Sequence, residues 1–275
     1  MARPVVLYRP YEFEYSDGEL EAMRANFPTT PYRSDIVQDD LVIGRYSVLP
    51  FYREQAEDFS KAEAELINSY HQHRYIADLS KWYSDLEGLT PKTWFDLNFI
   101  DGAGPYVLKG ETNSRRQKWS THMYAEDADR ARRVYARLKD DQLLANQTIC
   151  IRKFEKLRSL GTQVNGMPIG LEYRFFICDQ QILSGGFYWS SCVGDCSEIP
   201  PVSVVPQEFL EEVVAKIGDS ARYYVIDVGQ RADGQWIVIE LNDAQMSGLS
   251  ENRPEVLFSN LRLVLNGENS FWKQK

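Results

Sequence analysis

Two hydrophobic segments joined by a short polar turn restrict most strongly what this chain can fold into. Residues 222–229 and 236–243 are rich in valine, isoleucine and aromatic residues, and an Asp233-Gly234 pair lies between them. Such a pair between two hydrophobic runs is typical of a β-hairpin. Because successive side chains point to opposite faces of a strand, we expect two distinct faces on the second segment. One face would carry Trp236, Val238, Glu240 and Asn242, and the other Ile237, Ile239 and Leu241.

Three oxygen-bearing side chains of this hairpin are candidate metal ligands. A turn centred near Asp233-Gly234 places Asp227 opposite Glu240, or one residue away from it. Two facing carboxylates repel each other unless a cation lies between them. Carboxylate and amide oxygens are ligands that Mg²⁺ accepts. The pattern therefore predicts a Mg²⁺ site at Asp227, Glu240 and Asn242, although ordinary polar residues at the end of a hairpin would give the same sequence.

The same segment resembles a known family. Asp227 on one strand, followed by Glu240-x-Asn242 on the next, is similar to the metal-binding end of the ATP-grasp superfamily. Residues 239–248, Ile-Glu-Leu-Asn-Asp-Ala-Gln-Met-Ser-Gly, resemble one ATP-grasp clade in particular. That clade occurs in bacterial and viral genomes and is related to the eukaryotic chaperone that assembles translation initiation factor two. The resemblance extends over most of the chain from about Ile43 onward.

The resemblance implies an α+β ATP-grasp fold, in which two α+β lobes enclose ATP, preceded by a small α/β module. We expect the N-terminal module at 1–95, the N-lobe with its lid loop at 96–150, and the C-lobe with the metal site at 151–275. The chain has 275 residues, of which 43% are hydrophobic, so it is long enough to bury one large or two modest cores.

The first of these parts has the sequence pattern of an α/β unit. Hydrophobic runs predict strands at 4–8 and 41–43. A capping-box spacing that begins at Ser16 predicts a helix at 16–26. Apolar residues at helical spacing predict a second helix at about 54–70.

Charge and hydropathy argue against two classes of partner. The formal net charge of −9 argues against a broad electrostatic surface for duplex nucleic acid, although a local basic groove stays compatible with it. The chain contains no apolar run of the length that spans a membrane, and its start lacks the apolar core of a signal peptide. We therefore expect a cytoplasmic protein that does not bind membranes.

A lysine inside a short strand is the first candidate phosphate ligand. Lys109 shares a strand face with Val107, where a cation destabilises the fold unless an anion pairs with it. Residues 111–121 follow and are basic, rich in hydroxyl groups and without helical periodicity. They fit a solvated surface loop, or a mobile lid that brings Arg115, Arg116 and Lys118 to the β- and γ-phosphates. The resemblance supports Lys109 and Lys118 as the two phosphate lysines.

A further strand at 148–155 carries two adjacent cations. A plain core strand would leave Arg152 and Lys153 unexplained. The resemblance implies that this segment links the two lobes. Arg152 would then be directed at phosphate, and the backbone of Lys153 and Phe154 at adenine.

Glu172 and Arg174 are two residues apart on another expected strand. Taken alone, they would form a same-face salt bridge of little energetic value. The resemblance implies that Arg174 lies near the transferred phosphoryl group and that Glu172 orients it. Together with Lys118, these residues are the candidate catalytic groups.

The resemblance implies an ATP- and Mg²⁺-dependent ligase. Such an enzyme forms an acyl phosphate on a carboxylate substrate and joins it to an amine or a similar nucleophile, and both substrates can be small molecules or peptides. The sequence has no Gly-x-x-x-x-Gly-Lys loop and no kinase-type His-Arg-Asp, so the common alternatives for ATP binding lack their signatures.

Two other functions fit the same residues. The pocket could serve as an ATP-dependent switch in an assembly or interaction protein. Alternatively, the acceptor could be a nucleic acid, with the lid arginines near its phosphodiester backbone. The acidic composition counts against this last function.

Overall fold

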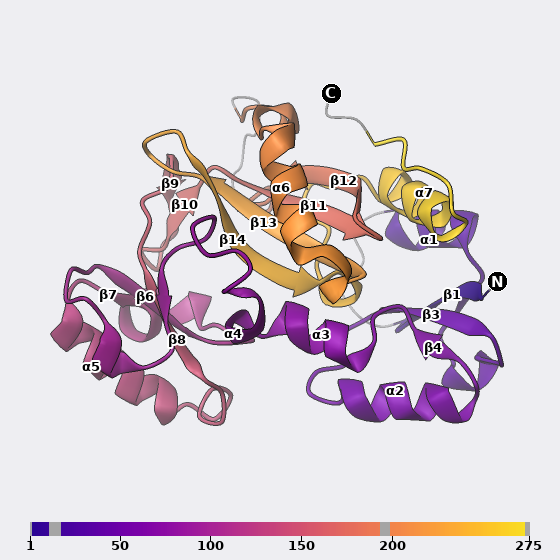
Figure 1. Ribbon diagram of the computed structural model, residues 1–275, viewed down its shortest axis with the longest axis horizontal. Helices are drawn as coiled ribbons and strands as arrows, with labels where there is room; N and C mark the ends of the chain where they lie inside the picture. The colour runs from indigo at the N-terminus through magenta and orange to yellow at the C-terminus, as the bar shows by residue number, and fades with distance from the viewer. Residues whose placement is uncertain (1, 11–17, 193–198, 273–275) are drawn as a thin grey trace.

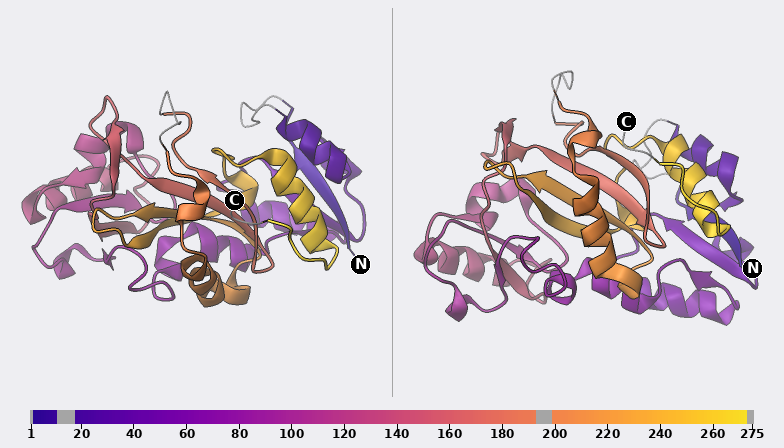
Figure 2. Two further views of the ribbon diagram at one scale, coloured as in Figure 1. Left: turned by 90° about the horizontal axis from the view of Figure 1, so that it is seen from above. Right: turned by 45° about the horizontal axis from the view of Figure 1, so that its top comes forward.

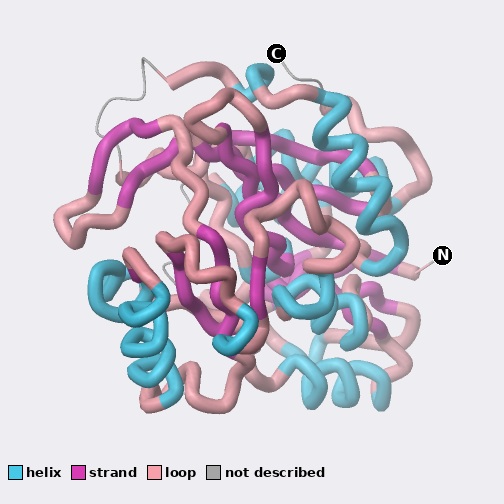
Figure 3. The backbone as a smooth tube through the Cα atoms, turned by 60° about the vertical axis from the view of Figure 1, so that its left-hand side comes forward, coloured by secondary structure: helices cyan, strands magenta, loops and turns pink. Residues whose placement is uncertain are grey.

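The computed structural model describes residues 2–10, 18–192 and 199–272. Within them, three four-stranded sheets and one two-stranded sheet lie among the helices (Figures 1 and 3). No helix of this part of the chain is long and apolar enough to cross a membrane. Short turns of 3-10 helix connect the main elements, at Arg33–Asp35, Leu97–Phe99, Arg116–Lys118, Val202–Val204, Gly218–Ser220 and Ala244–Met246.

The N-terminal sheet is entirely parallel. It contains β1 (Arg3–Tyr8), β2 (Thr29–Thr30), β3 (Asp40–Arg45) and β4 (Glu65–Leu66) in the order β2-β1-β3-β4. Helices α1 (Glu19–Asn26) and α2 (Tyr52–Lys61) cover opposite faces, because alternate residues of β1 and β3 enter two different hydrophobic clusters. Helices α3 (Tyr70–Ala77) and α4 (Leu79–Trp82) then lead into the rest of the chain.

Both helices of this module differ in detail from the sequence prediction. The prediction of a helix at about 54–70 is wrong for the second half of that range, because α2 ends at Lys61. Glu63 adopts a left-handed conformation with φ of 56°, which stops the helix, and β4 then pairs with β3. Helix α1 begins at Glu19 after Gly18, and Ser16 lies outside the described residues.

The second sheet is antiparallel and has the order β5-β8-β6-β7. Its strands are β5 (Thr93–Trp94), β6 (Tyr106–Gly110), β7 (Tyr124–Ala125) and β8 (Ile149–Lys153). Helix α5 (Ala128–Lys139) packs its apolar stripe on this sheet in one hydrophobic cluster. The Asp127 side chain caps the helix by accepting a hydrogen bond of 2.7 Å from the Arg130 N–H.

The third sheet carries the hairpin expected from the sequence. Its strands are β11 (Glu172–Cys178), β12 (Gln181–Phe187), β13 (Tyr223–Gln230) and β14 (Trp236–Asp243), in the order β12-β11-β13-β14. Helix α6 (Gln207–Ile217) covers one face, and α7 (Pro254–Leu265) together with α1 covers part of the other (Figure 2). A separate hairpin, β9 (Ser159–Thr162) and β10 (Pro168–Gly170), precedes this sheet.

A β-bulge changes the expected faces of β14. Asp227 pairs with Glu240 as predicted, but Val228 pairs with Val238, so Ile239 is an additional residue on β14. The prediction that Trp236 and Val238 share a face with Glu240 is therefore wrong. Val238 belongs to the same core cluster as Leu241, and Trp236 packs against that cluster. Glu240 and Asn242 stay together on the opposite face.

Candidate functional site

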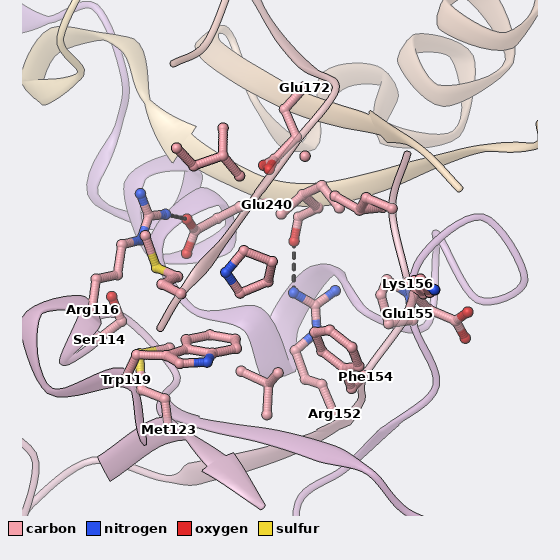
Figure 4. A pocket seen from close by; sticks show the side chains of 18 of the residues that line it. Ser114, Arg116, Trp119, Met123, Arg152, Phe154, Glu155, Lys156, Glu172 and Glu240 are labelled. Atoms are coloured by element: carbon pink, nitrogen blue, oxygen red, sulfur yellow. Dashed lines mark hydrogen bonds and ion pairs between the residues drawn. The ribbon is translucent and has the colours of Figure 1, made fainter. Parts of the chain in front are cut away.

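A cavity of about 320 Å³ lies between the second and third sheets. The segments that line it are β6, the lid residues after it, β8 with the chain that follows, β10 and β14 (Figure 4). Its apolar wall is formed by Val107, Trp119, Met123, Phe154, Met167 and Ile169. The ring of Phe154 makes edge contacts with Trp119 and Tyr124, at centroid distances of 6.3 and 5.5 Å. A flat aromatic group would fit against this wall.

Glu240 lies at the polar end of the cavity and is held by two cations. Its carboxylate accepts hydrogen bonds from Lys109 and, at 3.1 Å, from Arg116. In Figure 4 the side chains of Arg116 and Glu240 point toward each other. Burial by itself would raise the pKa of Glu240, but the positive charges of Lys109 and Arg116 outweigh it and lower the pKa to about 2.

Asp227 faces Glu240 across the hairpin and has its own cation. The register of β11 and β13 places Arg174 beside Asp227, and the guanidinium donates two hydrogen bonds of 2.8 Å to the two carboxylate oxygens. A third nitrogen of Arg174 donates to the Gly248 carbonyl at 2.8 Å. The cation required between the facing carboxylates is thus supplied here by protein side chains.

Asn242 lies two residue pairs further along the hairpin, opposite Val225. It is half-buried and is not among the residues that line the cavity. Among the described residues, no group of three His, Cys, Asp or Glu side chains is arranged so that it could hold a metal ion. The assignment of Asp227, Glu240 and Asn242 as Mg²⁺ ligands stays a prediction.

The donor set of the cavity fits a magnesium nucleotide. Its lining has more cations than anions, with Lys109, Arg116, Arg152, Lys153 and Lys156 against Glu155, Glu172 and Glu240. The buried Nε of Arg152 has no hydrogen-bond partner within the described chain. A buried unpaired donor and an excess of positive charge favour an anionic ligand. Glu240, with Asp227 behind the cavity lining, would bind a divalent cation beside that ligand by giving up the present side-chain partners.

Arg152 also connects the two sheets. Its side chain donates to the Ile239 carbonyl at 2.6 Å and to the Thr90 hydroxyl at 2.7 Å. Burial lowers its pKa, and the charge of Glu240 opposes that shift. Two of its three nitrogens are therefore bound to protein groups, and the buried Nε has no partner in the described part of the chain. The phosphate contact expected for Arg152 stays a prediction.

The segment after Arg152 was expected to bind adenine through the backbone of Lys153 and Phe154. Both residues line the cavity, but their N–H groups donate to the Lys92 carbonyl at 2.8 Å and the Pro105 carbonyl at 2.9 Å. The next residues, 155–157, also line the cavity and were missed in the sequence analysis. No periodicity marks them, because they follow the end of β8 directly.

Of the three lid residues expected to approach the phosphates, Arg116 alone lines the cavity. Lys118 is exposed and does not line the cavity. Arg115 is bound to Asp141, with a distance of 2.8 Å from Nε to the carboxylate. Arg116 lines the cavity, where it contacts Glu240 and also donates to the Tyr188 hydroxyl. The segment forms a 3-10 turn at Arg116–Lys118 and a π-helical turn at Trp119–Met123, and these turns decide which side chains point inward.

Glu172 has a partner other than Arg174. It accepts a hydrogen bond of 2.8 Å from the Trp189 indole N–H, while Arg174 is oriented by Asp227 and Gly248. Burial raises the pKa of Glu172 to about 7, and the Trp189 hydrogen bond opposes this shift. Glu172 therefore contributes to the cavity wall a buried carboxyl group whose charge depends on pH near neutrality.

Comparisons with known proteins agree with this architecture. The family model for the ATP-grasp domain of R-two-K clade family 3 matches residues 100–261, which is more than half of the chain. No curated protein matched the sequence.

Solved structures share the fold at low sequence identity. The D-cycloserine synthetase DcsG has a TM-score of 0.61 at 15% identity, with 96% of this chain and 99% of that chain covered. A RiPP-associated ATP-grasp ligase of Chryseobacterium gregarium also has a TM-score of 0.61, at 11% identity, with 100% of this chain and 100% of that chain covered. That ligase was solved in complex with ADP and a leader and core peptide. A RimK domain protein of Sphaerobacter thermophilus has a TM-score of 0.57 at 15% identity, with 94% of this chain and 98% of that chain covered.

These matches confirm the predicted ATP-grasp fold class, whereas the relation to the initiation factor chaperone stays a prediction. The strands that carry Lys109, Arg152, Arg174, Asp227 and Glu240 all lie inside the matched region. The chain therefore belongs to R-two-K clade family 3 of the ATP-grasp domains.

Proposed function

We propose that this protein is an ATP- and Mg²⁺-dependent ligase that activates a carboxylate as an acyl phosphate and joins it to an amine. The observation that carries the proposal is the arrangement of Lys109, Arg116 and Arg174 around the facing carboxylates Asp227 and Glu240. Solved neighbours of the same fold are named as ligases and were crystallised with ADP, Mg or AMPPNP.

ATP would lie in the cavity between the second and third sheets. The apolar wall around Phe154 would hold the adenine ring, and residues 155–157 would provide backbone groups for its edge. The Nε of Arg152 and the ammonium of Lys109 would contact the phosphates. Lys118 would reach them only after a movement of the lid, because its side chain is exposed in this structure.

The chemistry requires neutralisation of charge on the transferred phosphoryl group. A Mg²⁺ ion bound by Asp227 and Glu240 would offset the charge of the phosphates. Arg174 would stabilise the γ-phosphoryl group while a carboxylate oxygen of the substrate attacks the phosphorus and ADP leaves. An amine then attacks the acyl carbon, the carbon–oxygen bond to phosphate breaks, and an amide and inorganic phosphate result.

Oxygen isotope transfer tests this proposal directly. A panel of carboxylates, each labelled with ¹⁸O in the carboxyl group, is incubated with the protein, ATP, Mg²⁺ and a panel of amines. The phosphate released should contain one ¹⁸O atom from the carboxylate, because the acyl phosphate keeps that oxygen bridging carbon and phosphorus. Tight Mg·ATP binding without ADP release across the panel would contradict the ligase and support the ATP switch.

The kind of substrate is a further part of the proposal. Structures of the neighbouring ligase PsnB contain a precursor peptide, and DcsG is a synthetase of a small molecule. Small-molecule and peptide carboxylates are therefore both included in the panel. We expect a cytoplasmic location, as ATP-dependent ligation requires cellular ATP.

A further inference from the structure

The ring of Tyr188 lies beside two arginines of the region proposed for phosphoryl transfer. The guanidinium carbon of Arg174 lies 4.8 Å from the centre of this ring, and that of Arg116 lies 5.6 Å from it. Arg116 also donates a hydrogen bond to the Tyr188 hydroxyl. In the part of the chain that the structure describes, no other ring has two cations in such contact. Because the face of an aromatic ring attracts cations, one side chain stabilises both guanidinium groups.

The pairing of β11 with β12 places the ring there. Tyr188 directly follows β12, and its N–H donates to the Glu172 carbonyl at 2.9 Å, so the antiparallel pairing continues by one residue. Tyr188 therefore lies opposite Glu172 and on the face of the sheet that carries Arg174. Arg174 itself pairs with Gly186, which has no side chain. Its neighbour with a ring on β12 is thus the diagonal one, at a separation that long and aromatic side chains bridge.

Tyr188 acts at a distance from any nucleotide in the cavity. Tyr188 is half-buried and, like Arg174, is not among the residues that line the cavity, whereas Arg116 is one of them. An effect of Tyr188 on nucleotide binding must therefore act through the two arginines.

The two guanidinium groups are close enough to repel each other. Burial lowers the pKa of Arg174 and the charge of Arg116 acts in the same direction, but Asp227 outweighs both and the pKa is raised. In this structure Asp227 binds Arg174, and Glu240 binds Arg116. A Mg²⁺ ion held by these two carboxylates would take them away from the arginines. The Tyr188 ring would stay, because it binds no metal.

We propose that Tyr188 is a positioning residue, whose ring keeps the guanidinium groups of Arg174 and Arg116 together at the terminal phosphate of ATP. The inference rests on the proposed function, which places Arg174 beside the transferred phosphoryl group. The ring provides the position, and the hydroxyl adds one hydrogen bond to Arg116. The contribution of Tyr188 should therefore be confined to the terminal phosphate.

Affinities for Mg·AMPPNP and Mg·ADP, measured by calorimetric titration, test this role. The ratio of the two affinities reports contacts with the terminal phosphate, since both nucleotides share the nucleoside and the two inner phosphates. Tyr188→Leu removes the ring, and it should lower the affinity for Mg·AMPPNP about tenfold while the affinity for Mg·ADP stays unchanged. Tyr188→Phe keeps the ring and should lose at most about threefold, the effect of one hydrogen bond.

Tyr135→Leu is the matched control. Tyr135 is also half-buried, on α5, where it packs against the hydrophobic cluster of the second sheet. No cation lies over its ring within the described residues, so both affinities should stay as in the wild type.

A double variant separates positioning from a general effect on the fold. If Tyr188 acts through Arg174, the variant Tyr188→Leu/Arg174→Gln should lose less of the affinity ratio than the product of the two single losses. Independent losses that multiply would count against a shared role.

Three further results would overturn the inference: an unchanged affinity ratio in Tyr188→Leu, equal weakening of both nucleotides in that variant, or a loss in Tyr188→Phe as large as in Tyr188→Leu. The ¹⁸O measurement keeps the ligase proposal apart from this one. An affinity ratio that depends on Tyr188, in a protein whose wild type transfers no ¹⁸O, would reject the ligase alone. Transfer by the wild type, with an unchanged ratio in Tyr188→Leu, would reject the positioning role alone.

Discussion

Arg174 binds both carboxylate oxygens of Asp227 at 2.8 Å, and Lys109 and Arg116 bind Glu240 in the same region of the hairpin. The two carboxylates expected to bind Mg²⁺ are thus paired with the cations expected to bind phosphate. Binding of Mg·ATP would exchange these partners, since phosphate takes the cations and Mg²⁺ takes the carboxylates. Buried charges would keep a partner in both states, which avoids the large penalty of an unpaired buried ion.

Glu240→Gln tests this exchange. The amide keeps the shape of the side chain but not the charge that binds Mg²⁺, and it releases Lys109 and Arg116 for phosphate. We expect Mg²⁺ to lose its support of nucleotide binding, with affinity for Mg·AMPPNP falling on the order of 100-fold, or about 2.7 kcal/mol. Calorimetric titration with and without Mg²⁺ measures this. Asp233→Asn, at the exposed turn of the same hairpin, is the control, and an unchanged affinity for Glu240→Gln would reject the metal site.

Arg116 and Arg115 form a natural pair for a second test. Arg116 points into the cavity and Arg115 is bound to Asp141 outside it. Arg116→Ala should weaken binding of Mg·AMPPNP about tenfold, as expected for one charge-assisted hydrogen bond to phosphate. Arg115→Ala should leave the affinity unchanged. Equal losses in the two variants would show that the lid binds nucleotide in a different conformation from this structure.

Glu172→Gln should change how stability depends on pH. Burial in the folded protein raises the pKa of Glu172 from 4.5 to about 7. At a pH between these two pKa values, the folded state keeps a proton on Glu172 that the unfolded state has lost. Stability therefore falls as pH rises through this window, by up to about 3 kcal/mol from this group. Glutamine stays neutral and can still accept the Trp189 hydrogen bond.

Denaturant unfolding at pH 5 and pH 8, without nucleotide or Mg²⁺, measures the effect. Relative to the wild type, Glu172→Gln should be stabilised more at pH 8 than at pH 5. The exposed Glu268→Gln serves as the control, and a difference between wild type and Glu172→Gln that does not vary with pH would refute the prediction.

The sequence was sufficient for the features that local patterns determine. The Asp233-Gly234 turn predicted a hairpin with Asp227 opposite Glu240 or one residue away, and the pairing with Glu240 is confirmed. The pairs nearest the turn, such as Gln230 with Trp236, would by themselves place Asp227 opposite Ile239, so the bulge decides between the two registers. The bulge at Ile239 was not predictable, because no glycine or polar residue marks it there. An extra residue in one strand moves Trp236 and Val238 to the other face.

The lid and the connecting segment depend on tertiary contacts that a sequence pattern does not encode. Whether Arg116 or Lys118 points inward is decided by the turns at 116–123 and by the partners Tyr188 and Glu240, which lie far away in the chain. The approach of Arg9 to Tyr46 likewise requires the parallel pairing of β1 with β3.

A buried polar contact fixes the N-terminal module against the third sheet. Asn68 donates to the Tyr223 carbonyl at 2.7 Å and to Asp243 at 3.1 Å, and it accepts from the Tyr223 N–H at 2.8 Å. Asp243 also contacts His73 at 3.0 Å, and the His73 ring stacks on Tyr52 with a centroid distance of 3.8 Å. The network therefore joins β13 and β14 to the N-terminal module.

Asn68→Ala should destabilise the protein by about 3 kcal/mol, because it leaves the backbone groups of Tyr223 and an oxygen of Asp243 buried with fewer hydrogen bonds. We expect Mg·AMPPNP to bind as before, since Asn68 does not line the nucleotide cavity. Denaturant unfolding and titration with Mg·AMPPNP measure these two effects, with the exposed Asn146→Ala as the control. Unchanged stability of Asn68→Ala would show that the contact does not hold the module against the third sheet.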